Sequence, residues 1–203
     1  ESQSESPELF SQVKAKLGES PVVGYIGSLR ELEGVDLTAN AVALLRHQGV
    51  DAKLFVLSSE AGQSELLAHC ERIGIGEHAH IEGPVPHEQV AQFYDLIDVF
   101  VVSRPDTRVT RLVTPLKPFE AMRSSRALVM SDLPALSEII ADGKTGRLYP
   151  AGDVESLAAT IRELLEDESQ RRALGTAAAE WVASERTWSK VVEGTTEVYQ
   201  SLL

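Results

Sequence analysis

Residues 114–122, which read Thr-Pro-Leu-Lys-Pro-Phe-Glu-Ala-Met, carry the most informative side chains of the sequence. Pro118 suits the first position of a helix, which would place Glu120 in the first helical turn, where the helix dipole stabilises a carboxylate. A favourable charge at a helix start is therefore one interpretation of Glu120. The other is that Glu120 accepts hydrogen bonds from a ribose, while Lys117 and the free N–H groups of the helix start hold a diphosphate. Both roles use the same geometry and can coexist.

Polar loops rich in glycine, serine and charge follow the apolar runs of the sequence. They comprise residues 27–34, 58–62, 83–85, 103–117 and 131–133. In an open parallel sheet, ligands bind beyond the carboxyl ends of the strands, where such loops lead into helices. Exposed backbone N–H groups at helix starts bind anions. The loops therefore predict a ligand that carries phosphate.

The sequence does not match other motifs with defined chemistry. Residues 24–34 lack the glycine spacing of a dinucleotide fingerprint, and Gly143-Lys144-Thr145 lacks the upstream glycine of a Walker loop. The sequence has no Gly-x-Ser-x-Gly elbow of a hydrolase. His78 and His80 would share one side of a strand, but no third ligand at suitable spacing accompanies them. We therefore expect no metal and no cofactor.

Composition narrows the possible partners. The chain has 203 residues, with 19 basic and 31 acidic side chains and a net charge of −12. This charge repels phosphate backbones, so we expect no nucleic acid as a partner. The single cysteine, Cys70, excludes an intramolecular disulfide and is expected to be a small buried apolar residue on a helix. The apolar runs are far shorter than the ~20 residues that span a bilayer.

The elements that must position these residues follow from the apolar periodicity. Short apolar runs predict strands at residues 21–26, 52–57, 80–82, 99–102, 127–130 and 147–149. Amphipathic stretches predict helices at residues 35–48, 64–73, 86–95, 118–124, 134–141, 154–165, 169–183 and 188–203. Residues 103–116 are expected to be irregular. The alternation is typical of an α/β fold, a Rossmann-like three-layer sandwich with a six-stranded, mainly parallel sheet and a helical C-terminal tail.

Several ordered segments carry a resemblance to a known family. They are residues 23–29 with 33–37, 81–85, 93–99, 114–122 and 138–148. In their order and spacing they resemble the carboxyl-terminal half of the family-four glycosyltransferases, retaining enzymes with the two-domain GT-B fold. The resemblance implies that the chain is one half of a GT-B fold. It also implies that this half binds the nucleotide of a sugar donor, while the other half binds the acceptor.

The resemblance assigns roles to individual residues. Glu120 matches the second glutamate of the family's pair and would hydrogen-bond the ribose hydroxyls. The other donor-binding positions would lie near the base (Gly83 and Val85), the diphosphate (Thr114, Pro115 and Leu116) and the sugar phosphate (Gly27 and Ser28). Lys117 and Arg30 are the expected catalytic residues, because a cation can neutralise the departing diphosphate without a metal.

The sequence also departs from the family pattern. The first glutamate of the pair falls on Leu112, whose side chain cannot accept a hydrogen bond, and the basic residues usual in the first loop fall on Ser28 and Glu33. Nearby cations would compensate if they gathered beside Glu120. The expected group is Arg104, Arg108, Arg111 and Lys117.

The expected organisation has three parts. Residues 1–20 would form a linker or an N-terminal helical lead-in, residues 21–185 the Rossmann-like nucleotide-sugar-binding domain, and residues 186–203 a C-terminal helix that packs across to a missing N-terminal domain. The sequence opens without Met on a polar, turn-prone stretch, which we interpret as a cut or processed start.

The main functional hypothesis is a donor-binding domain of a retaining glycosyltransferase. The full protein would move a sugar from a nucleoside-diphosphate sugar to an acceptor glycan, a lipid-linked acceptor or a small molecule held by the N-terminal domain, and the isolated fragment would be inactive. The alternative is a non-catalytic GT-B-like binding or scaffold domain whose donor site has degenerated. An epimerase or a phosphorylase on the same architecture is a third hypothesis. The expected location is the cytoplasm, with the inner face of the membrane as an alternative for the full-length protein.

Overall fold

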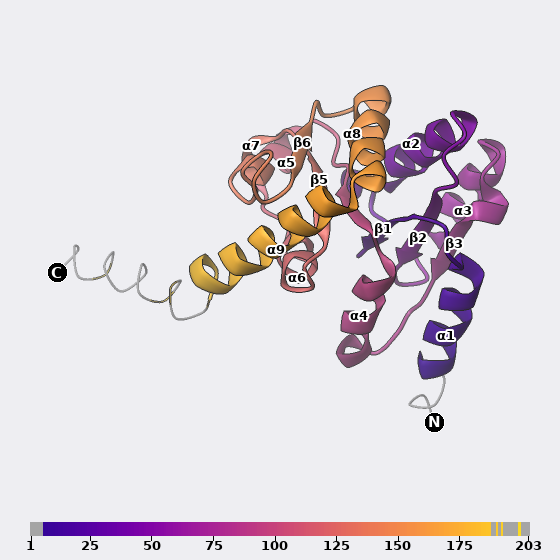
Figure 1. Ribbon diagram of the computed structural model, residues 1–203, viewed down its shortest axis with the longest axis horizontal. Helices are drawn as coiled ribbons and strands as arrows, with labels where there is room; N and C mark the ends of the chain where they lie inside the picture. Colours follow the sequence, from indigo (N-terminus) through magenta and orange to yellow (C-terminus); the bar gives the residue numbers. More distant parts are fainter. Residues whose placement is uncertain (1–5, 188–189, 191, 193–198, 200–203) are drawn as a thin grey trace.

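In the part of the chain that the structure describes, six strands form one parallel sheet (Figure 1). The computed structural model describes residues 6–187, 190, 192 and 199. The strands are β1 (Val22–Ile26), β2 (Lys53–Leu57), β3 (Ala79–Glu82), β4 (Val99–Val102), β5 (Ala127–Ser131) and β6 (Arg147–Tyr149). Their order is β3-β2-β1-β4-β5-β6, which is the doubly wound Rossmann order. The expected α/β fold is confirmed, and every strand pair is parallel.

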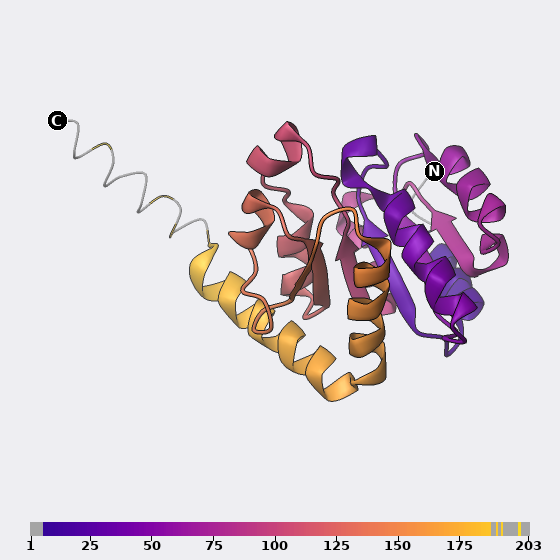
Figure 2. The ribbon, with the colours of Figure 1, turned by 90° about the horizontal axis from the view of Figure 1, so that it is seen from above.

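Helices cover both faces of this sheet. One face carries α2 (Val35–His47), α3 (Gln63–Arg72) and α8 (Val154–Glu166), and the other carries α1 (Ser6–Leu17), α4 (His87–Phe93) and α6 (Lys117–Arg123) (Figure 1). The remaining α-helices are α5 (Arg108–Leu112), α7 (Pro134–Ser137) and α9 (Glu168–Glu185), and single 3-10 turns occur at Glu31–Glu33, Gly76–His78 and Tyr94–Leu96. Seen from above, α2 and α8 run beside each other (Figure 2), and α9 packs against α6 and β5. Each amphipathic helix thus buries its apolar side against the sheet.

The centre of the sheet is densely packed. All four residues of β4 are buried, as the continuous apolar run predicts for a strand covered on both faces. On β1, Gly24 allows the side chain of Ile97 to approach closely, because a Cβ atom at position 24 would lie 2.4 Å from Cγ1 of Ile97. This packing brings Ile97, just before β4, against the middle of β1.

Helix α1 extends this core at the N-terminal side of the described residues. It buries Val13 and Leu17, and the ring of Phe10 meets the edge of Phe93 with 5.5 Å between the ring centroids. At the C-terminal side, most of the helix expected at residues 188–203 lies outside the described residues. None of the described helices combines the length and the apolar character needed to cross a membrane.

One helix was not expected. The segment 103–116 contains α5, which begins with a capping box: the Thr107 hydroxyl accepts a hydrogen bond from the Thr110 N–H at 3.3 Å, and the Thr110 hydroxyl accepts one from the Thr107 N–H at 3.0 Å. These reciprocal bonds satisfy two backbone donors at the helix start. The expectation of an irregular segment was therefore wrong for residues 108–112, because the two threonines stabilise a helix too short to show an apolar period.

Candidate functional site

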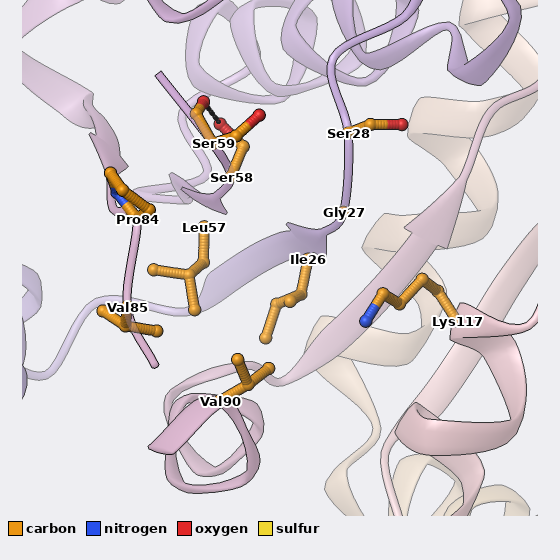
Figure 3. Close-up of a pocket in the computed structure, with 10 residues that line it drawn as sticks. All are labelled: Ile26, Gly27, Ser28, Leu57, Ser58, Ser59, Pro84, Val85, Val90 and Lys117. Carbon is orange, nitrogen blue, oxygen red and sulfur yellow. Dashed lines mark hydrogen bonds between the residues drawn. The ribbon is translucent and has the colours of Figure 1, made fainter. Parts of the chain in front are cut away.

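A cavity of about 310 Å³ lies beyond the carboxyl ends of β1, β2 and β3 (Figure 3). The strand order reverses between β1 and β4, and in open α/β sheets this switch point is where ligands bind. Residues 26–28 and 57–59 line the cavity at the ends of β1 and β2, and Pro84, Val85 and Val90 line it on the side of α4. Lys117 enters from α6, with its amino group directed toward Ile26. The cavity therefore combines an apolar floor with one cation.

A second cavity of about 410 Å³ lies between α4 and α6. Tyr94, Glu120 and Arg123 line it, and it shares Val90 with the first cavity. The two cavities are connected chemically as well, because Lys117 of the first forms an ion pair with Glu120 of the second. Together they offer adjoining spaces of the size usual for small-molecule sites.

The carboxylate of Glu120 is held by two side chains. The Lys117 ammonium donates hydrogen bonds to both Oε1 and Oε2 at 3.0 Å, and the Tyr94 hydroxyl donates to Oε2 at 3.0 Å. Glu120 and Lys117 are partly exposed, whereas Tyr94 is buried. Burial raises the pKa of Tyr94 well above its ordinary value, and the Glu120 charge raises it further, so the phenol stays a donor. The carboxylate keeps capacity to accept hydrogen bonds from a ligand.

A second carboxylate, Glu33, is neutralised inside the protein. Arg104 donates from Nε and Nη2 to the two oxygens of Glu33 at 3.0 and 2.8 Å, and from Nη1 to the Val113 carbonyl at 2.9 Å. Arg104 is only 4% exposed. Burial raises the pKa of Tyr25 far above its usual range, and the nearby Glu33 carboxylate adds to this. This ion pair ties the loop after β1 to the loop after β4.

The expected group of four cations is therefore not formed. Arg104 points inward to Glu33, and Arg111 forms an ion pair with Asp106 at 2.5 Å on an exposed surface. Arg108 is exposed on α5. Of the four, Lys117 alone bonds to Glu120 in the part of the chain that the structure describes.

The other expected site residues lie at different distances from this centre. Gly27, Ser28 and Val85 line the first cavity with Lys117. Gly83 supports its wall, with a positive φ of 107° and no room for a Cβ atom, which would lie 2.3 Å from the Ser58 carbonyl oxygen. The segment that leads into α6 alternates in exposure: Thr114 and Leu116 are exposed and Pro115 is buried.

Arg30 is not brought to Lys117. It lines a separate cavity of about 400 Å³ between the loop after β1 and the helices α2 and α3, together with the acidic side chains of Glu31, Asp36 and Glu65. Leu112, at the position of the family's first glutamate, is 72% exposed on α5. The sequence alone did not identify Tyr94 or the Glu33–Arg104 pair, although Tyr94 lies within a segment that carries the resemblance.

Comparison with known proteins identifies the family to which the chain is similar. The family described as glycosyl transferases group 1 matches residues 7–181. Over 205 residues, the chain is 29% identical to D-inositol 3-phosphate glycosyltransferase 1 of Catenulispora acidiphila, covering 95% of this chain and 47% of that protein. It is 28% identical to alpha-maltose-1-phosphate synthase of Mycolicibacterium smegmatis, covering 94% of this chain and 51% of that protein. The chain spans about half the length of the curated relatives it matches.

Solved structures show the same fold. The C-terminal domain of the group 1 family protein LpcC from Francisella tularensis superposes with a TM-score of 0.72 at 18% identity, covering 88% of this chain and 92% of that chain. Anabaena HepE in complex with UDP-glucose superposes with a TM-score of 0.78 at 19% identity, covering 100% of this chain and 54% of that chain. The chain therefore has the fold of the C-terminal half of a GT-B protein.

Proposed function

Because the chain belongs to the group 1 glycosyl transferases, we propose that it binds a nucleoside-diphosphate sugar as the donor half of a retaining glycosyltransferase. The observation that carries the proposal is the pairing of Lys117 with Glu120 across two adjoining cavities at the switch point of the sheet. A cation for phosphate and a carboxylate for hydroxyl groups stand side by side there. The complex of HepE with UDP-glucose supports the ligand class.

The cavities suggest how the donor lies. We assign the ribose hydroxyls to Glu120, the diphosphate to Lys117, and the base to the apolar wall around Val85, which Gly83 supports. Backbone groups of Gly27 and Ser28 would face the sugar phosphate. The segment leading into α6 would meet the diphosphate through its main chain, and its members are Thr114, Pro115 and Leu116.

In the proposed reaction, the bond between the anomeric carbon and the diphosphate oxygen breaks, and the electron pair leaves with the diphosphate. A bond to the acceptor oxygen forms on the same face of the sugar, and the acceptor proton goes to the departing diphosphate oxygen. Lys117 stabilises the charge that develops on the diphosphate, an electrostatic effect of the kind that contributes most to many enzymatic rates. Arg30 lines another cavity, so we assign it no contact with the diphosphate. From the same resemblance, we propose that another part of the full enzyme holds the acceptor.

A non-catalytic binding domain is the second candidate. The observation that favours it is the exposed Leu112 at the position where the family has its first glutamate, together with the burial of Glu33 and Arg104 away from the cavity. Such a domain would keep the fold but would no longer bind the donor. Nucleotide binding therefore separates the two candidates.

The test is calorimetry with UDP, GDP and ADP on the wild type and on two variants. Glu120→Ala should weaken nucleotide binding by about tenfold or more, because hydrogen bonds to a charged group are lost. Glu155→Ala is the matched control, since Glu155 also lies in the first turn of a helix, α8, but lines neither cavity. Equal affinity in the Glu120 variant would reject its assignment to the ribose. Wild-type protein that binds none of the three nucleotides at millimolar concentration would favour the non-catalytic domain.

A further inference from the structure

The hydroxyl of Tyr94 donates a hydrogen bond to the carboxylate that the proposed function assigns to the ribose. We propose that Tyr94 is a positioning residue: it holds Glu120 in the orientation that receives the ribose hydroxyls, and so sets the preference for ribose over deoxyribose. This inference rests on the proposed function, because it concerns the same site. It adds a residue that touches Glu120 rather than the donor.

The geometry separates the two partners of Glu120. Lys117 lines the first cavity, where the diphosphate is assigned, whereas Tyr94 lines the second with Glu120. A phosphate in the first cavity would compete with Glu120 for the Lys117 ammonium, whose three donors now go partly to the carboxylate. The bond from Tyr94, at 3.0 Å to Oε2, does not face that competition. It is the contact that remains when Lys117 turns to phosphate.

Tyr94 is suited to this role because its ring is buried and packed against the core. It is 1% exposed and follows α4 in a 3-10 turn, where its ring packs against Phe100 of β4 with 5.6 Å between the centroids. Phe100 lies at the centre of the sheet and is itself fully buried. The orientation of the Glu120 carboxylate is thus tied through two rings to the rigid core.

A free glutamate side chain has several rotamers, and fixing it costs free energy when a ligand binds. A carboxylate that is already oriented avoids part of this cost. The benefit appears only for ligands that bond to the carboxylate. Loss of the Tyr94 hydroxyl should therefore weaken the binding of a ribonucleotide more than the binding of its deoxy form.

The experiment measures dissociation constants by calorimetry for whichever of UDP, GDP and ADP binds, and for its 2′-deoxy and 3′-deoxy forms. In the wild type, the ribonucleotide should bind more tightly than at least one deoxy form. In Tyr94→Phe, the ratio between deoxy and ribo dissociation constants should fall by roughly three- to tenfold. Tyr149→Phe is the matched control, because Tyr149 is equally buried but its hydroxyl bonds to Ser131. Its ratio should stay at the wild-type value.

Each outcome decides a separate point. An unchanged ratio in a folded Tyr94→Phe variant overturns the positioning role and leaves the donor proposal intact. A wild type that binds the nucleotide but does not discriminate against either deoxy form overturns the inference as well, since Glu120 then does not read the ribose. A wild type that binds no nucleotide overturns the proposed function and the inference with it.

A second measurement covers the case in which Tyr94→Phe does not fold. In the wild-type chain labelled with 3-fluorotyrosine, the ¹⁹F resonance of Tyr94 should shift more on binding the ribonucleotide than on binding the deoxy form. Since the chain has four tyrosines, the resonance is assigned by elimination from the Tyr25→Phe, Tyr149→Phe and Tyr199→Phe variants. Equal shifts with both ligands would overturn the inference.

Discussion

Replacing Arg104 by Met should destabilise the protein more than any other removal of a charged side chain near the site. Arg104 is 4% exposed and bonds to both oxygens of Glu33 and to the Val113 carbonyl. Without the guanidinium, the buried Glu33 carboxylate has no cation to compensate it. Breaking a buried ion pair in this way costs about 3–5 kcal/mol of unfolding free energy. For a chain of this size, that loss lowers the melting temperature by roughly 6–20 °C.

We attribute the loss of unfolding free energy to the unpaired charge of Glu33. A double-mutant cycle tests this attribution. Glu33→Met alone leaves the Arg104 guanidinium buried with only a carbonyl partner, so it should also destabilise. The double variant, with Met at both positions, buries no charge, and replacing a buried pair by apolar side chains is often close to neutral. We expect the double variant to be more stable than Arg104→Met alone. The coupling energy should therefore be large and favourable.

Urea denaturation at neutral pH, followed by circular dichroism, measures these differences, with constant slopes as the check on two-state unfolding. Arg111→Met is the control, because the Arg111–Asp106 pair is exposed, with side-chain exposures of 53% and 45%. An exposed pair contributes little, so this variant should unfold at nearly the wild-type urea concentration. The reasoning is refuted if Arg104→Met unfolds at the wild-type midpoint, or if the double variant shows the sum of the two single losses.

Two further predictions concern the core and the loop after β1. Cys70 is fully buried, and burial raises its thiol pKa to about 11, so it should react with a disulfide reagent at pH 8 only after denaturant is added; rapid reaction of the native protein would contradict this. Gly34→Ala should lower the melting temperature more than Gly49→Ala. Both glycines have a positive φ, but they differ in the space around them. A Cβ atom at position 34 would lie 2.0 Å from the Ser103 carbonyl oxygen, whereas one at position 49 would meet nothing within 4 Å. Equal losses in the two variants would show that the close approach does not matter.

The fold followed from the sequence because its determinants are local. The run Val99–Val102 predicts a strand buried on both faces, and the observed β4 has the same bounds and lies next to β1 at the centre of the sheet. Most boundaries elsewhere differ by a residue or two, as helix and strand ends commonly do, whereas the helix expected at residues 134–141 ends at Ser137. The helix α5 escaped prediction because a capping box, and not an apolar period, stabilises its five residues.

The site followed only in part, because its charges are paired across the chain. The sequence placed Arg104 with the cations of its own loop, but its partner Glu33 is 71 residues away, in the loop that follows the neighbouring strand β1. Tyr94 and Glu120 are 26 residues apart, and the aromatic residue reads in the sequence as part of the core. Such pairs depend on where two strands end relative to each other. The local sequence pattern does not show how far apart two such strand ends lie in the fold.

The ion pairs at the site determine how this acidic chain would bind an anionic donor. A group of four cations at one loop would attract the diphosphate mainly by its charge. The structure instead neutralises Arg104 with Glu33 and Arg111 with Asp106, and pairs Lys117 with Glu120. A diphosphate that binds to Lys117 must therefore replace a carboxylate, so the net Coulombic gain is small. We therefore expect the affinity for the proposed donor to depend on the ribose and the base, and the orientation of the Glu120 carboxylate to matter more than the number of cations around it.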